Sequence, residues 1–86
     1  MEQLSLLFVT ITESLTNYQV NFLKAIIAGE TATSSFRVLS EYRLGTSANI
    51  TRSRKSLIEK DILDNKAGII SFQDPIYRHW LKSCYF

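Results

Sequence analysis

The chain has 86 residues, of which 45% are hydrophobic and 21% are charged, and its formal net charge at pH 7 is +2. This length allows one small domain and excludes two, and the composition is typical of a globular fold rather than of a disordered chain. The basic excess is small: it excludes a polybasic, histone-like protein and permits contact with nucleic acid without arguing strongly for it.

Cys84 is the only cysteine, which excludes an intramolecular disulfide and a cysteine-based metal site. A lone thiol suits a reducing compartment. The apolar residues at positions 4–11 are too few to span a bilayer, and they lack the basic start and the cleavage site of a signal peptide. The sequence therefore predicts a cytoplasmic protein with no membrane partner.

Residues 1–14 are predicted to form a first helix, because apolar side chains recur at helical spacing on a polar background. These positions, with one residue just beyond the segment, are Leu4, Leu7, Phe8, Ile11 and Leu15. An apolar helix face without a partner of its own favours dimerisation, so a homodimer is one expected assembly.

A second helix is predicted to begin after Thr16, which stands three residues before Gln19 in the spacing of a capping box. Leu15 and Val20 occupy the two positions of a hydrophobic staple at the same helix start. Gly29 stands where a residue with a left-handed backbone would end the helix.

A third and a fourth helix are predicted around a tight turn. A serine at position 34 or 35 caps the third, short helix. Leu44 and Gly45 form the turn, and Thr46 or Ser47 caps the fourth helix, which runs to about residue 60. A short helix, a turn that holds a glycine and a longer helix form the helix-turn-helix pattern.

After the fourth helix the pattern becomes β-prone at residues 62–63 and 69–72, on either side of a turn at residues 65–68. Asp74 followed by Pro75 indicates the start of a last short helix. Helix, helix-turn-helix and hairpin in this order predict a winged helix-turn-helix, a mainly α fold with a small β-hairpin (α+β).

Four sequence strings occur in order along the chain. They are LTNYQVNFLKA (residues 15–25), LGTSANI (44–50), DILD (61–64) and FQDPIY (72–77). Through them the chain, from about residue 11 to residue 86, resembles the C-terminal winged-helix region of archaeal-type AAA P-loop ATPases, which are also common in gut Bacteroidetes.

The resemblance implies a non-catalytic module behind a nucleotide-binding core and its helical lid. Residues 1–14 would then be a linking helix and residues 15–86 the winged-helix domain. ATP and Mg²⁺ would bind to the parent protein only, because this chain has three glycines and no G-x-x-x-x-G-K-[S/T] motif. The implied partner is the ATPase core or another protein subunit.

The sequence offers no catalytic, cofactor or metal site of its own. His79 is the single histidine, and it lacks the companions that a metal site needs. Asp61, Asp64 and Asp74 are dispersed among turn and cap positions, where aspartate has a structural role. We therefore expect no enzyme.

The fourth helix is the candidate DNA-binding element, because a winged-helix protein that binds DNA lays this helix in the major groove. From residue 43 to residue 61 there are five basic and two acidic side chains, a local net charge of 5 − 2 = +3. The candidate DNA contacts are Arg43, Asn49, Arg52 and Lys55, together with Lys66 on the predicted hairpin, which forms the wing of this fold. A solvated helix face has the same pattern, so this alternative stays open.

Helical rotation assigns the faces of the fourth helix. At about 100° per residue, Ile50 and Leu57 point into the core. Arg52 and Ser56 lie on the opposite side and are expected to face solvent.

Apolar side chains at both ends of the chain are the candidate protein interface. They are Leu4, Leu7, Phe8, Ile11, Trp80, Tyr85 and Phe86. Two functions therefore stay open: a protein-interaction or regulatory module, and a domain that contacts duplex DNA. The apolar ends and the mild charge favour the first.

Overall fold

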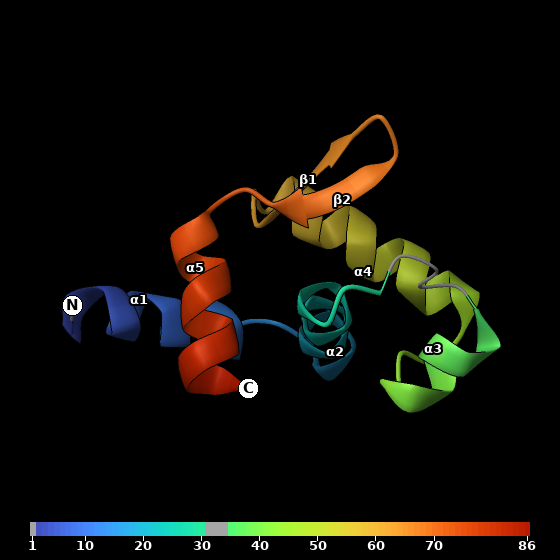
Figure 1. Cartoon of the computed structure of the whole chain (residues 1–86), viewed down its shortest axis with the longest axis horizontal. Coiled ribbons are helices and arrows are strands. Elements are labelled where there is room, and N and C mark those ends of the chain that lie inside the picture. Colours follow the sequence, from blue (N-terminus) through green and yellow to red (C-terminus); the bar gives the residue numbers. More distant parts are fainter. Residues whose placement is uncertain (1, 31–34) are drawn as a thin grey trace.

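The computed structural model describes the backbone of residues 2–30 and 35–86 and the side chains of residues 6–30 and 35–86. The elements are α1 (Glu2–Glu13), α2 (Asn17–Ile27), α3 (Phe36–Glu41), α4 (Ser47–Glu59), β1 (Leu63–Lys66), β2 (Ile69–Phe72) and α5 (Pro75–Trp80), which a π-helical turn (Leu81–Tyr85) extends. The predicted mainly α fold with one antiparallel hairpin is confirmed (Figure 1).

The elements form two groups around α2. Figure 1 shows α1 and α5 crossing at one end of the molecule, and α3 with the start of α4 at the other end. Helix α2 lies between them and packs against α4, while the hairpin contacts both α4 and α5. The strands β1 and β2 pair from Leu63 opposite Phe72 to Lys66 opposite Ile69.

Helix α2 begins and ends as the sequence predicts. The Thr16 hydroxyl oxygen accepts the Gln19 N–H at 3.2 Å, and the Gln19 side-chain oxygen accepts the Thr16 N–H at 2.8 Å, so the capping box is complete. At the other end Gly29 has a φ of +89°, and the N–H of Glu30 donates to the carbonyl of Ala25 at 3.1 Å. This hydrogen bond belongs to a Schellman motif, which ends the helix.

The turn between α3 and α4 contains two left-handed residues. Arg43 has a φ of +55° and Gly45 a φ of +83°, and between them Leu44 is fully buried. The N–H of Leu44 donates back to a carbonyl of α3 at 2.9 Å. Thr46 then caps α4 by accepting the N–H of Asn49 at 3.3 Å. The predicted turn and cap are confirmed, and the turn also includes Arg43.

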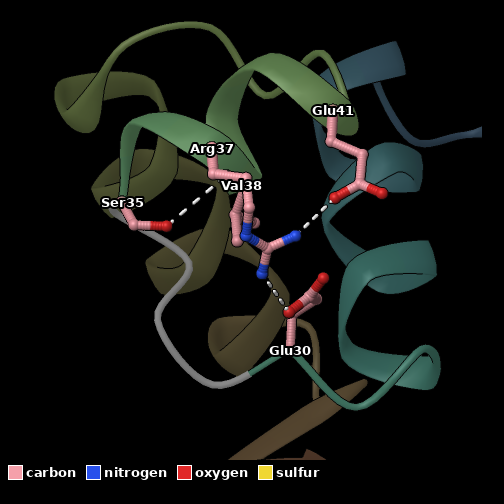
Figure 2. A network of polar contacts seen from close by, with 5 residues as sticks. All are labelled: Glu30, Ser35, Arg37, Val38 and Glu41. Carbon is pink, nitrogen blue, oxygen red and sulfur yellow. Dashed lines mark hydrogen bonds and ion pairs between the residues drawn. The ribbon is translucent and has the colours of Figure 1, made fainter.

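A salt-bridge network joins α3 to the end of α2 (Figure 2). The guanidinium of Arg37 lies 2.9 Å from a carboxylate oxygen of Glu30 and 2.6 Å from one of Glu41. The hydrogen bond from Arg37 lowers the pKa of Glu30. Ser35 caps α3 by accepting the N–H of Val38 at 3.4 Å. The other serine predicted as this cap, Ser34, lies outside the described residues.

The hairpin turn is shorter than predicted. It consists of Ala67 and Gly68, both with positive φ, which is the two-residue turn that matches the twist of paired strands. Asn65 and Lys66 therefore belong to β1 and pair with β2, although the sequence pattern placed them in the turn. The Asn65 side chain still shapes the turn, since its oxygen accepts the N–H of Gly68 at 3.1 Å.

A single core joins all these elements. The buried apolar side chains are Phe8, Phe22, Leu23, Ala25, Val38, Leu44, Ile50, Leu57, Ile62, Leu63, Tyr77 and Leu81. Helix α1 contributes Phe8, whose ring centroid lies 5.1 Å from that of Tyr77 and 5.6 Å from that of Trp80. Helix α1 therefore packs within the chain, on α5. The division of the chain at residue 14 stays a prediction.

A buried hydrogen bond reinforces the contact between α1 and α5. The hydroxyls of Thr12 and Tyr77 are 2.7 Å apart, and the Thr12 hydroxyl also lies 2.7 Å from the carbonyl of Phe8. Because Thr12 uses its only proton for that carbonyl, Tyr77 donates and Thr12 accepts. Burial raises the pKa of Tyr77.

We expect Thr12→Val to destabilise the fold more than Tyr77→Phe. The first change leaves a buried hydroxyl without a partner, at a cost of about 1–3 kcal/mol, whereas the second leaves Thr12 bonded to the Phe8 carbonyl and costs about 1 kcal/mol. Urea unfolding followed by circular dichroism measures both. The double variant should be more stable than Thr12→Val alone, and a double variant that loses the sum of both effects would contradict this assignment.

Candidate DNA and protein interfaces

The inward face of α4 follows the prediction in part. Ile50 and Leu57 are buried, as predicted. The prediction that Ser56 faces solvent is wrong: Ser56 is half-buried, and its hydroxyl accepts the side-chain N–H of Gln19 at 2.8 Å. The reason is that Gln19 is itself buried in the contact of α2 with α4 and needs an acceptor there. The face of α4 that is exposed to solvent is therefore narrower than predicted, because it does not include Ser56.

The exposed surface of α4 is positively charged. Arg52 and Lys55 are exposed on it, and the helix contains no acidic residue before Glu59. Among the described residues, the salt bridges involve Arg37 and Lys66, so none of the basic side chains of α4 takes part in one. These cations are therefore available to an anionic partner.

Asn49 and Arg43 have structural roles at the start of α4. The side-chain oxygen of Asn49 accepts the hydroxyl of Thr46 at 3.1 Å and lies 3.4 Å from the guanidinium of Arg52. Asn49 is half-buried, so it would have to leave this cap to read a base edge. Arg43 is exposed, and its carbonyl accepts the side-chain N–H of Asn21 at 3.2 Å.

The wing carries a weak signal for phosphate contact. Lys66 lies 3.6 Å from a carboxylate oxygen of Asp64, a pair that no sequence pattern indicated. The residue paired with Lys66 across the hairpin is Ile69, whose side chain is 70% exposed. The wing thus presents a cation that is already paired and an exposed apolar side chain. These features favour contact with a protein over contact with the phosphate backbone of DNA.

A groove of about 330 Å³ separates the start of α2 from α4. It is lined mainly by polar side chains, among them Gln19 and Arg52. Tyr18 stands at this groove and is 46% exposed.

Helix α1 and the last residues of the chain meet in an aromatic cluster, which we call the aromatic corner: Phe8, Tyr77, Trp80, Tyr85 and Phe86. The Trp80 ring stacks on Tyr77 at 6.2 Å and lies 5.7 Å from Tyr85, which lies 5.4 Å from Phe86. Exposure rises along this series, from buried Phe8 and Tyr77 to Tyr85 and Phe86, which are 43% and 40% exposed.

The other predicted interface residues lie on α1. Leu7 is 53% exposed, Ile11 is partly buried against the core, and the side chain of Leu4 lies outside the described ones. Leu6, which the helical-spacing pattern omitted, is 69% exposed and adds to the apolar surface of this helix.

A comparison with protein-family models matches residues 6–83 to a family described as a probable winged helix domain. The chain belongs to this family. The match runs from within α1 to the last turn after α5 and includes the helix-turn-helix and the wing. No curated protein and no solved structure matches the chain.

In this winged-helix domain the strings that carry the family resemblance specify turns and caps. In LGTSANI, Leu44 is buried, Gly45 allows close packing and Thr46 caps α4. In FQDPIY, the Asp74 carboxylate accepts the N–H of Ile76 at 2.9 Å to start α5, and Tyr77 is buried. These two strings therefore contain residues that form the turns, the caps and the core of the fold.

Within the described part of the winged-helix domain, no group of three or more histidine, cysteine, aspartate or glutamate side chains could hold a metal ion. Over the same residues, no helix is both long enough and apolar enough to cross a membrane.

We expect Gly45→Ala to destabilise the winged-helix domain more than Gly29→Ala. Both glycines have positive φ, which costs about 1–2 kcal/mol for alanine. Only at Gly45 would the new Cβ also meet other atoms, the side-chain nitrogen of Asn49 at 2.7 Å and the ring of Tyr18 at 3.1 Å. Thermal unfolding of the two variants measures the difference in stability. Equal losses of stability would contradict the prediction, because they would show that Asn49 and Tyr18 move aside without cost.

Proposed function

We propose that this winged-helix domain is a non-catalytic protein-interaction module of an AAA-type P-loop ATPase, which docks on the nucleotide-binding core or on another subunit. The resemblance of the four sequence strings supports the kind of parent protein. The aromatic corner carries the proposal of protein contact. The exposed Cys84, without a second cysteine in the chain, supports a reducing, cytoplasmic setting.

The aromatic corner has the properties of a binding anchor. Aromatic side chains are enriched at the energetically dominant positions of protein interfaces. Here Tyr85 and Phe86 are exposed, but Tyr85 packs on Trp80, which packs on buried Tyr77. Such a series holds the exposed rings in place before a partner arrives, which reduces the entropy lost on binding. The exposed Leu6 and Leu7 add apolar area on α1.

Sedimentation velocity tests this proposal. The domain is measured alone over a range of concentrations, and then with the nucleotide-binding core of an AAA-type ATPase that carries a domain of this family, supplied in trans. We expect a complex with the core, and we expect Tyr85→Ser/Phe86→Ser to weaken it by about tenfold or more, because two anchoring rings are lost. The core is used with and without ATP to detect any regulatory effect.

Phe36→Ser is the matched control, since Phe36 is 85% exposed and lies on α3, away from the aromatic corner. The control should bind the core like the unmodified domain. A domain that stays monomeric at all concentrations and does not bind the core would reject the proposal, and so would equal losses in Phe36→Ser and the double variant.

A second function, contact with duplex DNA through α4, is favoured by one observation. Arg52 and Lys55 are exposed, form no salt bridge among the described residues, and stand on a helix without acidic residues before its last position. Such cations neutralise phosphates and release counterions, which makes binding weaken steeply with salt. The cap role of Asn49 points to phosphate contact rather than to base reading.

Fluorescence anisotropy with a labelled random duplex tests the DNA function. If α4 is the site, binding is seen at low salt, weakens steeply towards physiological salt, and is lost in Arg52→Ala/Lys55→Ala. Arg78→Ala/Lys82→Ala removes the same charge from exposed positions at α5, so it separates a specific site from general attraction. Equal losses in both double variants, or no binding at low salt, would reject contact through α4.

A further inference from the structure

A second groove, which we call the α1 groove, lies where α1, the end of α4 and the start of α5 meet. Its volume is about 330 Å³, and its apolar lining consists of Phe8, Ile11, Ile62 and Tyr77. This volume is at the low end for ligand pockets, so it fits one or two side chains better than a cofactor. The groove is distinct from the exposed rings of Tyr85 and Phe86, which do not line it.

The rim of the α1 groove is acidic. Asp61 and Asp74 line it together with one cation, Lys60, which leaves a net charge of 1 − 2 = −1. Neither aspartate takes part in a salt bridge among the described residues. An apolar lining beside an acidic rim is complementary to an apolar side chain beside a cation.

We propose that the α1 groove binds a short segment of a partner protein that inserts a bulky aliphatic side chain into the apolar lining and places a neighbouring arginine or lysine against Asp61 and Asp74. This proposal rests on the proposed function in that the domain binds protein, and it adds a second site with its own chemistry. Because the lining includes both Phe8 and Tyr77, the inserted segment contacts α1 and α5 together. Binding therefore stabilises the position of α1 on the domain.

Chemical-shift titration of the ¹⁵N-labelled full chain tests the proposal. The probe is a blocked tetrapeptide with glycine, leucine, arginine and glycine in this order, and the matched peptide has glutamate in place of arginine. We expect saturable shifts at the backbone amides of Ile11, Ile62 and Tyr77, with the glutamate peptide about tenfold weaker because attraction becomes repulsion at the rim.

Two isosteric variants remove the rim charge without disturbing the fold. Asp61 has a φ of +61°, which asparagine tolerates, and Asp74 caps α5, where asparagine is equally effective. In Asp61→Asn/Asp74→Asn the preference for the arginine peptide over the glutamate peptide should disappear, while the leucine still binds. Asp64→Asn, on the wing, removes an acidic charge outside the groove and should keep the preference.

Several results would overturn the proposal that the α1 groove binds a segment of a partner protein. They are the absence of saturable shifts at its lining, equal binding of both peptides to the unmodified domain, and an unchanged preference in Asp61→Asn/Asp74→Asn. Shifts at the lining that depend on the concentration of the domain itself would also overturn it, because they would identify a second copy as the occupant. Loss of core binding in Tyr85→Ser/Phe86→Ser with no peptide binding would leave the proposed function standing and reject this site alone.

Discussion

The hydroxyl of Tyr77 is buried and needs a hydrogen-bond partner, and Thr12 on α1 provides it. Around the same ring lie Phe8 from α1, Phe72 from the wing and Trp80 from α5. One side chain therefore connects the first helix, the hairpin and the last helix. A domain of this size buries a modest apolar area, so the loss of one such contact is a large fraction of its stability. These contacts bring helix α1 to the same buried ring as the hairpin and α5.

The arrangement places two kinds of surface on different elements. The cations Arg52 and Lys55 lie on α4, whereas the exposed rings of Tyr85 and Phe86 follow α5. Figure 1 shows the start of α4 and the crossing of α1 with α5 at opposite ends of the molecule. An anionic partner at α4 and a protein partner at the aromatic corner therefore contact different elements, and the two functions can be tested separately.

Local signals in the sequence predicted most of the fold, because caps and turns depend on neighbouring residues. Thr16 with Gln19, Gly29 and Thr46 each stand within a few residues of the groups that they satisfy. Two contacts that the sequence did not reveal join residues far apart in the sequence. Ser56 pairs with Gln19, 37 residues away, and no local pattern reveals that bond. In the same way the pairing of Thr12 with Tyr77 could not be predicted, because a threonine in an amphipathic helix normally indicates the solvent side.

Native-state hydrogen exchange, read residue by residue, tests most directly whether α1 is part of the folded unit. If Tyr77 holds α1 to α5 as described, the amides of residues 8–13 exchange only through the same global opening as the amides of α2 and α4, with the same free energy. If α1 is an independent linking helix, these amides exchange through a separate opening of much lower free energy while α2 and α4 stay protected. That second result would contradict the role of Tyr77 in joining α1 to the rest of the domain.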